Sequence, residues 1–167
     1  LRMGTEVFSE RAARAGVDGV LILDLPLEEA GPFRRTIVEV GIDPIFLLSP
    51  TTTDERLKLA AELGRGFLYG ISRLGVTGVR AEVSPSARTL VRRIREVSSL
   101  PIAVGFGLSR PEHVREIGSC ADAAVVGSAL VEIIAQEASS PNLVSAVERY
   151  VSWLKGNGEV EGGAERT

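Results

Sequence analysis

Glycines interrupt the sequence at three points where an apolar run ends, and their spacing suggests anion binding. Tyr69 to Glu82 reads YGISRLGVTGVRAE, Val104 to Glu112 reads VGFGLSRPE, and Val125 to Leu130 reads VVGSAL. A phosphate dianion needs several N–H donors that converge on it, and backbone amides converge freely only where no side chain intrudes. The residues that fit this requirement are Gly78, Gly105, Gly107, Gly127 and Ser128.

The third of these stretches, VVGSAL, combines a glycine with a hydroxyl and the start of a helix. Ser128 begins an apolar helical stretch, and the N-terminus of a helix favours an anion. Ordinary turn glycines remain an alternative interpretation, because glycine is the commonest residue between helices and strands. The stretch GFGLSRP fails the G-x-G-x-x-G spacing of dinucleotide-binding proteins, and no glycine run leads into the Gly-Lys-Ser/Thr of a P-loop.

Other side chains have both a chemical and a structural interpretation. Asp24 ends the first apolar run, where it could act as a general base or anchor the following turn. Arg73 could bind an anion or pair with a carboxylate, and Tyr69 and Phe106 could line a pocket or fill the core. His113 falls inside a helix that begins near Pro111, so we expect it at the surface.

Composition excludes several classes of protein. The 167-residue chain has a net charge of −3, without the clustered basic charge of a nucleic-acid-binding surface. Cys120 and His113 are the only cysteine and histidine, which leaves no internal disulfide and no multi-histidine or cysteine-based metal centre. We expect a reduced, cytoplasmic location, with no signal peptide and no membrane span.

Helical periods alternate with short apolar runs along the whole chain. This order predicts an α/β domain with parallel strands, either an open doubly wound sheet or part of a (β/α) barrel. In both architectures the three glycine-containing stretches lie at the carboxyl ends of the strands. The expected strands lie within 17–26, 43–50, 66–72, 101–107 and 121–127, and the expected helices within 5–16, 27–41, 53–64, 84–99, 110–119 and 128–155, the last broken near Pro141.

Four motifs, in this order and spacing, closely resemble the tryptophan synthase alpha subunit family: VLILDLPLEEAGPF, ISRLGVTG, VGFGLSRPEHV and VVGSALV. The resemblance runs from about Gly4 to Trp153. It implies a parallel TIM barrel, here about five of its eight strands, and a lyase of tryptophan biosynthesis. That enzyme cleaves indole-3-glycerol phosphate to indole and glyceraldehyde 3-phosphate. A partner beta subunit, expected to carry pyridoxal phosphate, completes an alpha–beta heterotetramer, and no cofactor is expected in this chain.

The resemblance also implies roles for individual residues. Asp24 and Pro26 match the face toward the partner subunit, and a mobile lid matches Arg73, Gly75 and Thr77. The substrate and its phosphate are expected to contact Tyr69, Gly78, Gly105, Phe106, Gly107, Gly127 and Ser128.

One departure from the family pattern affects catalysis. The chain resembles the last five strands, so the two catalytic carboxylates of the family precede Leu1, and we identify no catalytic residue in it. An inactive fragment, or a module that binds phosphate or the partner, is therefore the alternative function. Two open sheet edges and an uncovered inner face predict an isolated chain that is marginally stable, self-associates or needs a complementing fragment. We expect a partial barrel over 1–155 and a polar, flexible tail over 156–167.

Overall fold

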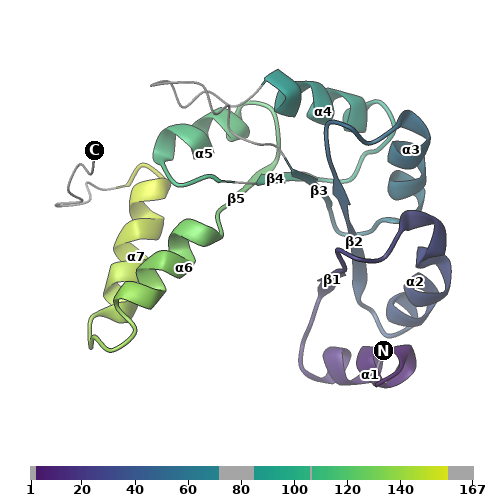
Figure 1. Cartoon of the computed structure of the whole chain (residues 1–167), viewed down its shortest axis with the longest axis horizontal. Coiled ribbons are helices and arrows are strands. Elements are labelled where there is room, and N and C mark those ends of the chain that lie inside the picture. The colour runs from purple at the N-terminus through teal and green to yellow at the C-terminus, as the bar shows by residue number, and fades with distance from the viewer. Residues whose placement is uncertain (1–2, 72–84, 106, 158–167) are drawn as a thin grey trace.

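A computed structural model describes residues 3–71, 85–105 and 107–157 of the chain (Figure 1). Helices and strands alternate through these residues, as the sequence predicts. The strands are β1 (Gly19–Leu21), β2 (Asp43–Leu48), β3 (Leu68–Ile71), β4 (Ile102–Gly105) and β5 (Ala123–Val125). The helices are α1 (Thr5–Arg14), the 3-10 turn η1 (Leu27–Glu29), α2 (Ala30–Glu39), α3 (Asp54–Leu63), α4 (Pro85–Arg95), α5 (Pro111–Gly118), α6 (Ser128–Gln136) and α7 (Leu143–Leu154).

The sheet order decides between the two predicted architectures. All four strand pairs are parallel, and the order in space is the order in the chain, β1-β2-β3-β4-β5. A doubly wound sheet reverses its strand order at a switch point, whereas a barrel does not. Figure 1 shows the strands along an arc, with α2, α3, α4 and α5 on its outer side. The described residues therefore form a segment of a (β/α) barrel.

The outer face of the sheet carries the hydrophobic core. Leu48, Leu68 and Ile102 lie on this face and are almost fully buried beneath the helices. The alternate positions Tyr69 and Ile71 point to the inner face, where they are only half-buried. Side chains on the inside of a closed barrel are packed against one another. The inner side of β3 is thus less well covered than its outer side.

Local signals in the sequence account for the helix boundaries. Thr53 begins α3 as a cap, because its hydroxyl accepts a hydrogen bond from the N–H of Arg56. Gly41, which follows α2, has a φ of 82°, a conformation that glycine adopts without strain. The predicted break near Pro141 separates α6 from α7.

One sequence prediction about side-chain exposure was wrong. His113 is not a surface residue: it lies on the buried side of α5 and is only 4% exposed. Its neighbours Pro111 and Ile117 are buried on the same helix, so the helical period placed the histidine with the core rather than with solvent. Within the described ranges, the helices lack the length and apolar character that a bilayer span requires.

Candidate phosphate-binding site

A cavity of about 430 Å³ opens where β4 and β5 end, and we call it the β4–β5 cavity. Parallel strands all leave the sheet at one edge, so the loops after β4 and β5 meet there. The cavity is lined by Tyr69, Gly107, Leu108, Ser109, Val125, Gly127, Ser128, Ala129 and Glu132. Four residues predicted from sequence to bind substrate or phosphate (Tyr69, Gly107, Gly127, Ser128) therefore share one cavity.

The start of α6 supplies hydrogen-bond donors to this cavity. The first N–H groups of a helix have no partner within the helix, and Gly127 provides no side-chain cap for α6. A Cβ placed on Gly127 would meet no atom within 4 Å, so the space beside this backbone is open. Gly107 faces the same cavity with a φ of 72°, which favours glycine. The cavity thus offers backbone donors and a positive helix end, the properties that bind an anion.

Gly105 serves packing in this structure. A Cβ at Gly105 would collide with the hydroxyl of Tyr69 and would lie 2.9 Å from the Cβ of Val125. The ring of Tyr69 therefore lies against the backbone of β4, and burial raises the pKa of its phenol. Gly105 does not line the β4–β5 cavity. Its glycine character lets Tyr69 reach the cavity wall.

Side chains from two helices hold the loop that carries Gly107. The N–H of Ser109 donates to Nδ1 of His113 on α5 at 3.1 Å. The hydroxyl of Tyr150 on α7 donates to the carbonyl of Ser109 at 3.0 Å. Leu108, between Gly107 and Ser109, is buried in the core. Sequence reasoning missed both His113 and Tyr150, and the only available signal was the position of His113 on the apolar side of its helix.

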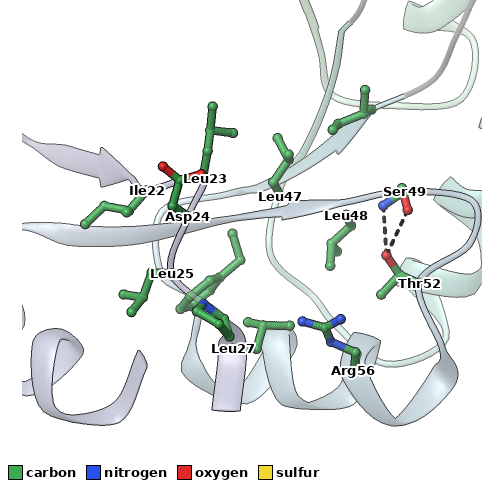
Figure 2. Close-up of a pocket in the computed structure, with 13 residues that line it drawn as sticks. Ile22, Leu23, Asp24, Leu25, Leu27, Leu47, Leu48, Ser49, Thr52 and Arg56 are labelled. Atoms are coloured by element: carbon green, nitrogen blue, oxygen red, sulfur yellow. Dashed lines mark hydrogen bonds between the residues drawn. The ribbon is translucent and has the colours of Figure 1, made fainter. Parts of the chain in front are cut away.

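A second cavity, of about 440 Å³, lies at the ends of β1 and β2, and we call it the β1–β2 cavity (Figure 2). Asp24 and Pro26 line it, and Leu23 beside them is 71% exposed. Arg56 on its wall pairs with Glu28 at 3.2 Å between Nε and a carboxylate oxygen. Apolar residues form much of the rest: Ile22, Leu25, Leu27, Phe46, Leu47, Leu48 and Ile71.

The two cavities approach each other across β3. Ile71 lines the β1–β2 cavity and Tyr69 lines the β4–β5 cavity, and both side chains lie on the inner face of β3. Of the remaining predicted residues, Arg73, Gly75, Thr77, Gly78 and Phe106 lie outside the described residues. Among the described residues, the histidine, cysteine, aspartate and glutamate side chains form no group suited to hold a metal ion.

Comparison with known proteins gives a consistent family. The family model described as "Tryptophan synthase alpha chain" matches residues 1–157. A tryptophan synthase alpha chain of Solibacter usitatus is 44% identical over 155 residues, which are 93% of this chain and 58% of the relative. One of Methanothermobacter thermautotrophicus is 48% identical over 134 residues, 80% of this chain and 50% of the relative.

A solved structure agrees with these relatives. A chain from the tryptophan synthase a2b2 complex of Pyrococcus furiosus superposes with a TM-score of 0.84 at 39% identity. The match covers 93% of this chain and 62% of the other. The chain thus spans about 58% of the length of the Solibacter relative and a similar share of the solved one.

Proposed function

This chain belongs to the tryptophan synthase alpha chain family, and we propose that it supplies the phosphate-binding part of the alpha-subunit lyase. The reaction cleaves indole-3-glycerol phosphate to indole and glyceraldehyde 3-phosphate in tryptophan biosynthesis. The observation that carries the proposal is the β4–β5 cavity, where Gly107, Gly127 and Ser128 gather beside the start of α6. We assign the reaction to the cytoplasm.

The arrangement of the two cavities supports a substrate with unlike ends. Phosphate bound at the start of α6 would direct the remainder of the molecule past Tyr69, across β3. Beyond β3 lie the apolar walls of the β1–β2 cavity, including Leu47 and Ile71. An indole ring is large and apolar and gains free energy when such a surface covers it. In this arrangement the start of α6 would hold the phosphate, and Leu47 and Ile71 would offer the indole ring an apolar surface.

The chain's own residues would bind and orient the substrate. The backbone N–H groups at the start of α6 and the hydroxyl of Ser128 would hold the phosphate. Tyr69 would contact the substrate between its two ends. Asp24 and Glu132 are the carboxylates on the two cavity walls, and we assign a catalytic role to neither.

We also propose that the segment between β1 and η1 faces a beta subunit. The solved relative from Pyrococcus furiosus is part of an a2b2 complex. Leu23 is an exposed large apolar side chain beside Asp24 and Pro26, and exposed apolar residues rimmed by polar ones are typical of protein interfaces. The pyridoxal phosphate of the complete enzyme would reside in that beta subunit.

Calorimetric titration tests the phosphate site. Wild type and Ser128→Ala are titrated with indole-3-glycerol phosphate and with indole-3-glycerol, which lacks the phosphate. Ser139→Ala is the matched control, because Ser139 is exposed beyond the end of α6. Loss of the Ser128 hydroxyl should weaken binding of the phosphorylated compound about tenfold and leave the other compound unaffected.

Equal affinity of wild type and Ser128→Ala for the phosphorylated compound would contradict the assignment of the cavity. Indole release is measured on the same samples in the presence of the beta subunit. Because we identify no catalytic residue in this chain, we expect saturable binding without indole release, and release of indole would contradict that assignment.

A further inference from the structure

The backbone of Ser109 is held at both of its polar groups by side chains from different helices. Its N–H donates to Nδ1 of His113 at 3.1 Å, and its carbonyl accepts from the hydroxyl of Tyr150 at 3.0 Å. His113 lies four residues further along the chain, whereas Tyr150 lies 41 residues away. The two bonds therefore tie one loop residue to both α5 and α7.

Burial makes these bonds costly to lose. His113 is 4% exposed and Tyr150 is 9% exposed, so water cannot readily replace either side chain. The ring of Tyr150 is further fixed by Trp153, whose ring centroid lies 5.7 Å away. Ser109 itself is half-buried, so its N–H and carbonyl have few replacement partners when one of these side chains is removed. The conformation at Ser109 is thus coupled to both side chains.

The second ring nitrogen of His113, Nε2, helps to identify which interaction requires a histidine at this position. Nε2 is buried and has no hydrogen-bond partner among the described residues. An apolar side chain of similar size would fill this space without the free-energy cost of a buried, unpaired nitrogen. Since Nδ1 accepts from an N–H, the neutral ring carries its proton on Nε2. Among the described residues, the acceptor at Nδ1 is therefore the one hydrogen-bonding group that accounts for a histidine here.

We propose that His113 and Tyr150 are positioning residues that hold residues 107–109 in the shape that presents Gly107 to the β4–β5 cavity. Leu108 is anchored in the core, so fixing Ser109 on one side constrains Gly107 on the other. That this cavity takes phosphate rests on the proposed function. The constraint on the loop does not, since it follows from the bonds at Ser109 alone.

Two substitutions separate the acceptor from the packing volume. His113→Asn keeps an acceptor oxygen close to the place of Nδ1 but leaves a void. His113→Leu fills the space but has no acceptor. Tyr150→Phe keeps the ring and removes the hydroxyl. A packing role predicts that Leu is tolerated better than Asn, whereas a positioning role predicts the reverse.

The experiment measures amide hydrogen exchange at Ser109 and affinity for inorganic phosphate in the wild-type chain and the three variants. We expect exchange at Ser109 to accelerate about tenfold in His113→Leu and to remain near wild type in His113→Asn. Phosphate affinity should follow the same order, with about a tenfold loss in His113→Leu and a similar loss in Tyr150→Phe. Circular dichroism verifies that each variant retains its helices.

The readouts distinguish two kinds of failure. If exchange and affinity are unchanged in His113→Leu and Tyr150→Phe, or if His113→Asn is the more affected histidine variant, the positioning role is overturned. If wild type binds no phosphate, the proposed function of the cavity fails, and the exchange rates at Ser109 still decide whether the two side chains hold the loop.

Discussion

Two loops at the same edge of the sheet are held in place by opposite kinds of chemistry. The loop after β2 is held by Arg93 of α4, which donates to the carbonyls of Pro50 and Thr52 and pairs with Asp54 at 2.6 Å. The loop after β4 is held by His113 and Tyr150 through the backbone of Ser109. The first attachment is charged and partly hydrated, whereas the second is neutral and made by two buried side chains.

The difference in burial predicts a difference in rigidity. The side chain of Arg93 is 25% exposed and that of Asp54 is 71% exposed, so water and salt compete with their interaction. Around Ser109 the partners are almost fully buried. A backbone that must hold N–H donors for an anion benefits from such fixed geometry. We therefore expect the loop after β4 to be more rigid than the loop after β2.

The largest expected loss of stability comes from a substitution that disrupts the contact between β3 and β4. Gly105→Ala would force a Cβ against the Tyr69 hydroxyl and to within 3.0 Å of the Val125 carbonyl. Overpacking of this kind costs about 2 kcal/mol, measurable by urea denaturation. Gly127→Ala is the matched control, because a Cβ there meets no atom within 4 Å. Equal stability of the two variants would contradict the packing role of Gly105.

Removing one hydroxyl tests the buried attachment itself. Tyr150→Phe leaves the Ser109 carbonyl without its partner and should lower the free energy of unfolding by about 1 to 2 kcal/mol. The change should be nearly independent of salt, because both groups are neutral. Urea denaturation at low and high sodium chloride measures it, and a strong salt dependence would contradict the comparison.

The pH dependence of stability tests the attachment of the loop after β4 through His113. Burial, followed by the nearby charge of Arg110, holds the pKa of His113 below its ordinary value of 6.5, although Glu112 and Glu116 act in the opposite direction. Glu116 is itself paired with Arg88 of α4.

The unfolded chain then binds more protons than the folded one, so stability falls as the pH drops below 6.5 toward the folded-state pKa. Denaturation between pH 7 and pH 5 should show this loss in wild type and a smaller loss in His113→Asn. The same pH dependence in both proteins would assign the loss to other groups.

The smallest expected effect is on the charged attachment. Arg93→Ala should cost about 1 kcal/mol in low salt, and less in high salt, because its partners are partly hydrated. Denaturation in the two salt conditions measures the difference. A loss larger than that of Tyr150→Phe in high salt would reverse the proposed order of the two loops.

Local sequence signals predicted the elements and part of the site. The hydroxyl of Thr53 and the break at Pro141 act within a few residues, so the strands and helices follow from nearby chemistry. Gly107, Gly127 and Ser128 were brought together because parallel strands end at one edge.

Contacts between distant parts of the chain were not predictable in the same way. Tyr150 reaches Ser109 across 41 residues, and the approach of Tyr69 to Gly105 depends on the register of β3 against β4. No pattern within a single segment specifies these two relations. The burial of His113, in contrast, had a local signal in its position on the apolar side of α5.

The most direct test is an amide NMR titration of the chain with indole-3-glycerol phosphate. We expect saturable shifts at Gly107, Gly127 and Ser128 and none at Gly41 after α2. That result would locate the phosphate between β4 and β5. A well-dispersed spectrum in which these three amides do not respond to the ligand would contradict the account.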